Sequence, residues 1–483
     1  MANTTSRPGS PKLRTAPFLF LLATLSAAPV GDLQAFETAD PFATGALVPP
    51  RPALSLDAPE PARRPCRPPS ADAVYGLIDV VDLALCQNPA TREVWSFARL
   101  QAAGVGIAQS DFLPALDGRL AANRVRASGQ SNTQKSGSLT LSWLLFDFGA
   151  RSANLEIARQ LLSAASATLD STVQNVFLSA VQAYYNAQAA RAAVDAARES
   201  EKASRESLSA AEVRYRVGSG TPADRLQAQT AWSQATLTRL RAEGVLRNTL
   251  GRLANVMGLD ADRPLPLDDI PAATPDAGFE RDVAALIDEA RARRPDLKAA
   301  EAELKAARSG IDYARAAGLP TLSLAAGPKW EDLGGVSANA SSIGLTLNLP
   351  IFSGFSTTYN VRAAEARSDV QAARVDNVRL QVALDVWEAY QSLSTAGQTI
   401  RTSADLLASA EHSERVALGR YKAGVGNILD VLNAQSALAG ARLQRIQAML
   451  DWYVSRAALA RAIGALDGKS LFSLGDGRKA QTP

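Results

Sequence analysis

A repeated sixteen-residue motif is the feature that most constrains how this chain can fold. The sequence RYRVGSGTPADRLQAQ begins at Arg214, and RYKAGVGNILDVLNAQ begins at Arg420, an offset of 206 residues. Eight of the sixteen positions are identical, including the Tyr, both glycines and the Asp. In each copy a helical pattern runs into two glycines, which permit the positive φ angles of a tight reversal, and a second helical pattern follows. Each copy therefore predicts the tip of a helical hairpin.

The same offset relates other parts of the chain. The segment LTLSWLLF, which begins at Leu139, corresponds to LTLNLPIF, which begins at Leu345, and Tyr184 corresponds to Tyr390. Solenoid repeats have periods of about 20 to 50 residues, so this much longer period indicates a duplicated half-protein. We expect a first structural repeat at residues 73–264 and a second at residues 279–468, joined by a linker at residues 265–278.

The amino terminus has the pattern of a secretory signal peptide. Three basic residues precede an apolar run at residues 16–28 that ends in small residues. The run is too short for a membrane-spanning helix. We expect a signal peptide over residues 1–28. Pro29 would hinder cleavage directly after Ala28, which leaves a neighbouring bond or one near Ala35.

Loss of those three basic residues would change the formal net charge from +3 to none, so the charge does not indicate a nucleic-acid partner. Residues 29–72 are rich in proline and lack apolar periodicity, which predicts an extended or disordered leader. Residues 469–483 are expected to form a tail. Cys66 and Cys86 could pair in an oxidising compartment or remain free thiols, and their spacing favours neither.

Two segments predict unusually long helices. Residues 151–217 contain neither Gly nor Pro, which allows one helix of about 100 Å, and residues 356–418 are similar except for Gly397. Apolar or small residues recur every seven positions in each segment, which predicts coiled-coil packing. The first series is Leu155, Leu162, Leu169, Val176, Ala183, Ala190, Ala197, Ser204 and Ala211, and the second is Val361, Ser368, Val375, Val382, Ala389, Ala396, Ser403, Ala410 and Ala417.

Four segments predict β-strands in two hairpins. They are residues 115–127 and 138–146, joined by a polar loop at 128–137, and residues 321–330 and 341–352, joined by a polar loop at 331–340. Apolar and polar residues alternate there, as in strands of a membrane β-barrel, with Thr140 and Thr346 on the inner face. The residues expected to face lipid are Leu139, Leu141, Trp143, Leu145, Ile343, Leu345, Leu347 and Leu349.

Four strands cannot close a barrel, and an open sheet edge in lipid would leave backbone groups without hydrogen bonds. The barrel must therefore be shared between subunits, and three copies would supply twelve strands, above the minimum of about eight. The predicted fold is mainly α with a smaller membrane β part. The alternative, a soluble coiled-coil rod, accounts for the helical seams but not for the four strands.

Residues that carry chemistry are scarce. His412 is the only histidine, which argues against a His-dependent catalytic triad and a His metal site. Neither tip is a nucleotide-binding loop, because Gly218-Ser219-Gly220 lacks the Lys of a phosphate loop and the second tip lacks a third glycine. We expect no catalytic residues, no metal and no cofactor.

The tip motif, found twice, and the turns LFDFG at residues 145–149 and IFSGF at residues 351–355 resemble those of the TolC family of outer-membrane channel-tunnels. The resemblance covers about residues 73–468. It implies a homotrimer whose twelve-stranded barrel in outer-membrane lipid continues into a twelve-helix periplasmic tunnel. It also implies that a periplasmic adaptor docks at the hairpin tips, around Gly218, Gly220, Gly424 and Gly426.

Within that family the chain resembles the outer-membrane components of type I secretion systems. The resemblance implies an inner-membrane ABC transporter as a further partner and an exported polypeptide, such as the haemolytic toxin cyclolysin, as cargo. The alternative within the family is drug efflux with a proton-driven pump. An alternative of another class is a passive, porin-like channel.

The resemblance also implies a periplasmic gate made of Asp430, Asn433, Tyr421 and Asp224. Tyr421 would donate a hydrogen bond to Asp224, and Asp430 would form an acidic ring around the threefold axis. The chain departs from the family pattern at three positions, where Gly426 replaces an Arg, Ala223 replaces a Thr and Asn433 replaces a second Asp.

Overall fold

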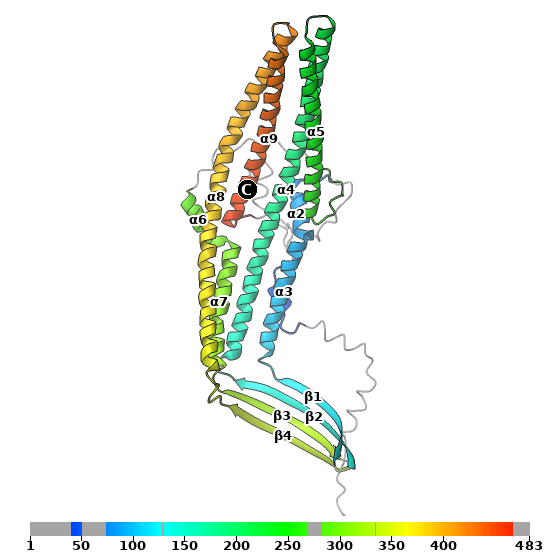
Figure 1. Ribbon diagram of the computed structural model, residues 1–483. Helices are drawn as coiled ribbons and strands as arrows, with labels where there is room; N and C mark the ends of the chain where they lie inside the picture. The colour runs from blue at the N-terminus through cyan, green and yellow to red at the C-terminus, as the bar shows by residue number, and fades with distance from the viewer. Residues whose placement is uncertain (1–39, 51–73, 128–129, 269–281, 334, 467–483) are drawn as a thin grey trace, which may run out of the picture.

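The structure is a computed structural model that describes residues 40–50, 74–127, 130–268, 282–333 and 335–466 (Figure 1). The signal peptide predicted at residues 1–28 and the tail predicted at residues 469–483 lie outside the described residues. Most of the predicted leader also lies outside them, as does residue 269 onward of the predicted linker.

The chain builds the same series of elements twice. The first series is α2 (Leu77–Gln87), α3 (Pro89–Ser110), β1 (Ala115–Ala127), β2 (Gln130–Phe146), α4 (Ala150–Arg216) and α5 (Pro222–Val256). The second is α6 (Val283–Arg293), α7 (Pro295–Ala316), β3 (Thr321–Leu333), β4 (Ser337–Asn348), α8 (Ser356–Lys422) and α9 (Ile428–Ile463). Every element of the second series except β4 begins 206 residues after its counterpart.

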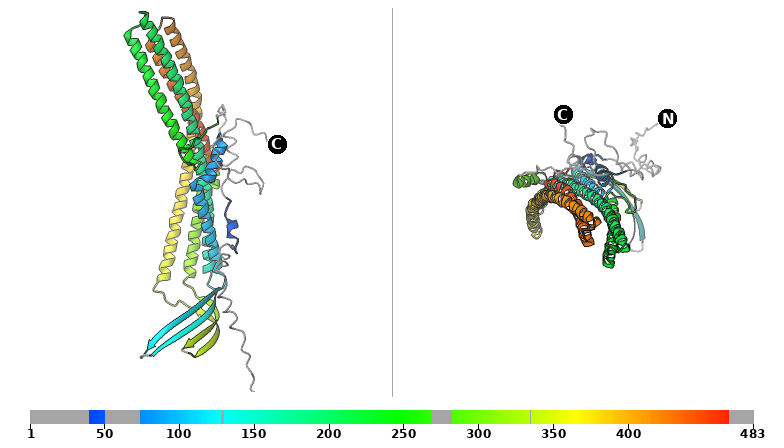
Figure 2. Two further views of the ribbon diagram at one scale, coloured as in Figure 1. Left: turned by 90° about the vertical axis from the view of Figure 1, so that its right-hand side faces the viewer. Right: turned by 90° about the horizontal axis from the view of Figure 1, so that it is seen from above.

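The elements form an elongated molecule (Figure 1). The helices α4 and α8 run from the two hairpin tips at one end to the sheet at the other. Viewed along the long axis, the helices lie side by side in an arc (Figure 2). In the described ranges, no helix is both long enough and apolar enough to cross a lipid bilayer.

Two helices, separated by an extended residue, precede each strand pair. The chain is extended at Asn88, between α2 and α3, and at Arg294, between α6 and α7. Both residues precede a proline, which disfavours the helical conformation of the residue before it. The side chain of Asn88 caps α3 by accepting a hydrogen bond from the Ala90 N–H at 2.9 Å.

The two long helices are continuous. Each of α4 and α8 has 67 residues, and Gly397 does not interrupt α8. Every position of the two seven-residue series is buried or half-buried along both helices. The spacing thus marks the face along which each long helix packs.

The four strands form one antiparallel sheet in the order β1-β2-β3-β4, so β1 and β4 are its edges. β1 has the expected bounds, whereas β2, β3 and β4 extend further at the far end, so the polar loops predicted at residues 128–137 and 331–340 are wrong over most of their length. Pairs such as Asn123 with Gln134 continue the ladder through polar sequence. Backbone hydrogen bonds maintain the strands there although the apolar alternation has ended.

Part of the segment expected to be an extended or disordered leader is ordered against α3. Residues 44–47 form a short 3₁₀ helix, and the Trp95 indole donates a hydrogen bond to the Pro49 carbonyl at 3.1 Å. Val48 packs against the small cluster of Ala102 and Val105. Cys86, in α2, is disulfide-bonded, and the other cysteine, Cys66, lies outside the described residues.

The main hydrophobic core lies midway along the molecule, where the short helices α2 and α6 cover the long ones. Its fully buried side chains include Phe177, Leu253, Met257 and Leu286. The rings of Tyr185, in α4, and Tyr453, in α9, stack there with centroids 4.4 Å apart. This core joins the two halves of the chain.

A buried ion network accompanies the core in the second half. Arg294, 3% exposed, donates to Asp296 Oδ1 at 2.9 Å and to Asp385 Oδ2 at 2.6 Å. Arg461 also contacts Asp385, at 3.2 Å. Burial acts to raise the pKa of Asp296, but its hydrogen bonds and ion pair with Arg294 outweigh burial and hold that pKa below its ordinary value.

We expect Arg294→Met to destabilise the fold by about 3 kcal/mol, because it removes the guanidinium that is hydrogen-bonded to the Asp296 carboxylate beside the core. The exposed pair of Arg291 with Asp288 supplies the control, and Arg291→Met should cost less than about 1 kcal/mol. Thermal unfolding followed by circular dichroism measures both.

The same network predicts acid sensitivity. Because the folded-state pKa of Asp296 is lowered, its contribution to stability is present above its ordinary pKa and is lost as the pH falls through the lowered value. Acidification should therefore destabilise the parent chain more than Arg294→Met. Equal acid sensitivity of the two chains would contradict this role for the network.

Both hairpin tips are built from the same turn. In the first, the N–H groups of Gly218 and Ser219 donate to the carbonyls of Tyr215 and Arg214, which is a Schellman motif, and the second tip repeats it. Only the first glycine of each tip has a positive φ, +75° at Gly218 and +81° at Gly424. The expectation that all four glycines supply positive φ angles is therefore wrong.

The second glycine of each tip is needed for a different reason, which is close backbone approach. A Cβ added at Gly426 would lie 2.9 Å from the Tyr421 nitrogen, and one at Gly220 would lie 3.2 Å from the Tyr215 nitrogen. These contacts would force the turn away from the end of the preceding helix.

We expect Gly424→Ala to cost about 1 to 2 kcal/mol, because of its left-handed conformation, and Gly426→Ala to destabilise the tip by steric overlap with backbone atoms. The control is Gly440→Ala in α9, where a Cβ meets nothing within 4 Å and helix propensity should add up to about 1 kcal/mol. Hydrogen exchange of tip amides and thermal unfolding measure these effects. A Gly426→Ala variant that is as stable as the parent chain would count against the close-approach explanation.

Candidate functional site: hairpin tips and four-stranded sheet

The two hairpins are linked near their tips by Arg214 and Tyr421. Arg214 Nη1 donates to the Tyr421 carbonyl at 3.0 Å, and its guanidinium lies 4.7 Å from the centroid of the Tyr421 ring. Tyr421 is buried with Ile428 and Val431. A cation held over an aromatic face adds about 0.5 to 2 kcal/mol. The Arg214 side chain of α4 thus binds Tyr421 at the end of α8.

Asp224 does not make the link expected of it. Its carboxylate accepts from the Thr221 N–H at 3.0 Å, as part of a capping box at the start of α5. Among the described residues, no hydrogen bond joins Asp224 to Tyr421. Burial raises the pKa of the Tyr421 hydroxyl, and the nearby charge of Asp224 adds to this while Arg214 opposes it.

The other predicted gate residues are exposed on α9. Asp430 lies in the first turn of the helix, which Asn427 caps by accepting from the Leu429 N–H at 3.1 Å. Asn433 lies one turn further on and is also exposed. Within the described part of the chain, the Asp430 carboxylate forms neither a hydrogen bond nor an ion pair. The Asp430 carboxylate is therefore accessible from solvent on the exposed side of α9.

One face of the sheet is apolar. Residues that lie directly opposite each other on neighbouring strands point to the same face of the sheet. Two rows of such opposed residues across the strands are apolar. One row is Leu116, Leu141, Ala326 and Ile343, and the next is Trp143, Leu324 and Leu345. All of the predicted lipid-facing residues except Leu145 and Leu349 lie on this face. Leu145 lies in a β-bulge, so Phe146 takes its place opposite Leu322, and Leu349 follows the end of β4.

The opposite face of the sheet is polar. It carries Thr140 opposite Asp117, and Lys329, which pairs with the Glu331 carboxylate on the same strand. Thr346 lies on the same face, opposite Ser323. The sheet thus separates an apolar from a polar side, as a wall between lipid and water would require.

A joint between sheet and helix was missed by the sequence reasoning. Arg151, at the start of α4, donates to Asp147 Oδ2 at 3.0 Å and to the Leu144 carbonyl at 2.6 Å. Its guanidinium also lies 5.0 Å from the Phe112 ring centroid. The sequence feature that could have predicted this contact is the four-residue spacing between the Asp of the LFDFG turn and the Arg that follows the turn.

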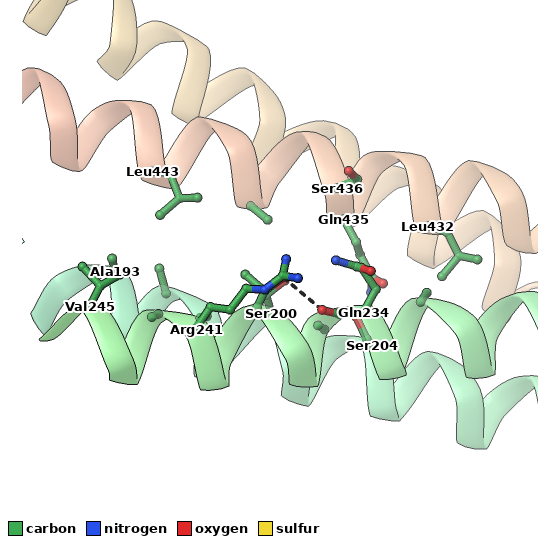
Figure 3. Close-up of a pocket in the computed structure, with 17 residues that line it drawn as sticks. Ala193, Ser200, Ser204, Gln234, Arg241, Val245, Leu432, Gln435, Ser436 and Leu443 are labelled. Atoms are coloured by element: carbon green, nitrogen blue, oxygen red, sulfur yellow. Dashed lines mark hydrogen bonds between the residues drawn. The ribbon is translucent and has the colours of Figure 1, made fainter. Parts of the chain in front are cut away.

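A second missed contact joins the two hairpins. Gln435, in α9, donates from Nε2 to the Ser207 Oγ, in α4, at 3.0 Å, and both side chains are buried. They lie beside a groove of about 480 Å³ between α4, α5 and α9, into which Gln435 points (Figure 3). Small residues such as Ala197 and Ser204 line the groove. Only the repeated Gln of the tip motif could have drawn attention to this contact.

Comparison with known sequences gives a consistent family. Residues 80–259 and 286–465 match the family model described as outer membrane efflux protein. Protein CyaE of Bordetella pertussis is 34% identical over 413 residues, which cover 83% of this chain and 87% of CyaE. The toluene efflux pump outer membrane protein TtgC of Pseudomonas putida is 27% identical, with 74% of this chain and 76% of TtgC covered.

Solved structures share the fold. The outer-membrane channel CmeC of Campylobacter jejuni gives a TM-score of 0.74 at 20% identity and covers 84% of this chain and 90% of CmeC. The outer membrane protein VceC of Vibrio cholerae gives 0.71 at 20% identity and covers 80% of this chain and 96% of VceC. Sequence and fold therefore agree, and the chain belongs to the outer membrane efflux protein family as an outer-membrane channel component rather than an enzyme.

Proposed function

We propose that the chain is the outer-membrane exit duct of a type I secretion system, through which a polypeptide such as a cyclolysin-like toxin leaves the cell. The observation that carries this proposal is the 34% identity with CyaE over most of both chains. It exceeds the 26% to 27% identity with the matched efflux proteins BepC and TtgC. The resemblance to secretion-system components points the same way.

Drug efflux is the second candidate function. The match to a toluene efflux pump component over 74% of this chain favours it. The two functions share the duct and differ in the inner-membrane partner, which is an ABC transporter for secretion and a proton-driven pump for efflux.

In either function we propose a homotrimer. The edges β1 and β4 would pair between neighbouring copies, because unpaired edges are not tolerated in lipid. Three four-stranded sheets would then form one twelve-stranded barrel in outer-membrane lipid, above a twelve-helix tunnel in the periplasm. The apolar face of the sheet, with Leu141 and Leu345, supports a barrel whose outside faces lipid.

The hairpin tips are proposed to dock a periplasmic adaptor protein. Val217 and Val425, at the two turns, are 71% and 70% exposed. An exposed apolar side chain on each glycine turn offers a contact for another helical hairpin. The adaptor would connect the duct to the inner-membrane transporter.

The gate is proposed to lie at the same end. Three copies of Asp430 in a narrow opening would repel one another and attract cations. Asn433 would add a polar ring without charge. The contact of Arg214 with Tyr421 would hold the two hairpins of each copy together.

Charge on the apolar face tests the barrel. Leu345→Arg should reduce insertion into lipid by about 2 to 4 kcal/mol if the site lies near the bilayer midplane. The control is Thr346→Arg on the polar face. The folded, inserted fraction in lipid vesicles measures both, and equal losses would mean that Leu345 does not face lipid.

The gate is tested by conductance in planar bilayers. Asp430→Asn should weaken cation preference and block by multivalent cations, whereas Asp405→Asn, at an exposed Asp of α8 several turns before the tip, should not. Arg214→Met should raise the conductance, because it removes both contacts with Tyr421. Tyr421→Phe keeps the ring and the carbonyl and should change it less. Unaltered conductance in Arg214→Met would count against a link that restrains the opening.

Export is tested in a strain that lacks the gene. The parent chain should restore a secreted polypeptide to the medium, and Val425→Asp should lower export roughly tenfold if docking loses about 1.4 kcal/mol. Val336→Asp, 72% exposed at the opposite end, is the matched control. Restored resistance to toxic small molecules without restored export would favour efflux instead.

A further inference from the structure

The contact between Ser207 and Gln435 is buried at a boundary where Ala and Ser are the most frequent residues, with Leu432 and Leu443 beside them. Ser207 is 3% exposed and Gln435 is 8% exposed. Gln435 Nε2 lies 3.0 Å from the Ser207 Oγ and 3.5 Å from the Ala203 carbonyl oxygen. Buried polar groups of this kind are retained where they are hydrogen-bonded. The pair therefore specifies how the first hairpin (α4 and α5) meets the second (α8 and α9).

The duplication supplies the same pair of residue types a second time. At the offset of 206 residues, Ser207 corresponds to Ser413 in α8, and Gln435 corresponds to Gln229 in α5. Within one chain Ser413 and Gln229 are both exposed. The helices that carry them lie at opposite edges of the arc (Figures 1 and 2), so they cannot meet within a single copy.

A ring of copies would bring these edges together. Within a chain, the first hairpin contacts the second through α4 and α9. In the repeat α4 corresponds to α8 and α9 corresponds to α5, so the equivalent contact joins α8 of one copy to α5 of the next. Head-to-tail contacts of this kind close into rings when the rotation permits. The boundary within a chain would then recur between chains.

The tip contact follows the same relation. Arg214 and Tyr421 meet within a chain, and their repeat counterparts are Arg420 in α8 and Tyr215 in α4. Arg420 is exposed, and Tyr215 is 40% exposed. Two separate contacts at different heights thus both have exposed counterparts at the edges of the arc.

We infer that Ser413 binds Gln229 of the partner subunit, repeating the bond between Ser207 and Gln435 across the boundary between copies. This inference rests on the ring of copies in the proposed function and adds the residues that align neighbouring copies. Arg420 stacks on Tyr215 of the partner subunit at the tip of the same boundary.

Cysteine cross-linking tests the inference on the full chain in detergent solution. The double variant Ser413→Cys with Gln229→Cys, treated with a short bismaleimide, should give covalent dimers and trimers on denaturing gels. The double variant Ser207→Cys with Gln435→Cys, at the matched position, should cross-link within one chain only and calibrates the reach of the reagent. Neither Ser413→Cys nor Gln229→Cys alone should give these products.

A second measurement does not depend on cysteine chemistry. Ser413→Ala and Gln229→Ala should each lower the temperature at which the trimer dissociates, and the two changes combined should lower it no further, because either removes the same bond. An assembled trimer that stays uncross-linked, or whose two alanine variants have additive effects, overturns the inferred pair while the proposed assembly stands. A chain whose native mass is that of a monomer overturns both.

Discussion

The packing of each long helix along its own seam is the interaction on which the rest of the structure depends, α4 against α5, α7 and α9, and α8 against α9 and α7. A helix of 67 residues draws most of its stability from burying one face rather than from its own hydrogen bonds. The seven-residue spacing keeps buried positions on one face over the whole length of α4 and α8. Because the sheet and the tips are attached to the ends of these helices, this packing also sets the distance between them.

The two halves share this packing and differ in their polar contacts. In the middle of the molecule, Arg294 forms a buried ion network where the first half has Asn88. At the sheet, Arg151 of the first half bonds the Asp147 carboxylate, whereas Thr357, its counterpart in the second half, contacts the Ser353 hydroxyl. The second half is thus held by charges at the central core, and the first half at its joint with the sheet.

The hairpin tips show how far local sequence can be interpreted. The repeated glycines predict a turn at each tip, and the structure has one. The different roles of Gly424 and Gly426 could not be predicted, because the second depends on the distance to the backbone of Tyr421. The strand ends were missed for a related reason, since backbone pairing continues where the alternation of side chains stops.

Sequence alone determined the elements of this protein: two halves, two long helices, four strands, two tips and the family resemblance. These follow from periodicity and from backbone preferences, which act over a few residues. Only the tertiary structure decided that Arg214 rather than Asp224 contacts Tyr421, and that Gln435 meets Ser207 across 228 residues of chain. A seven-residue period defines the buried face of a helix. It does not define how far the helix is shifted along its axis relative to a helix of the other hairpin, and this shift decides which polar side chains meet.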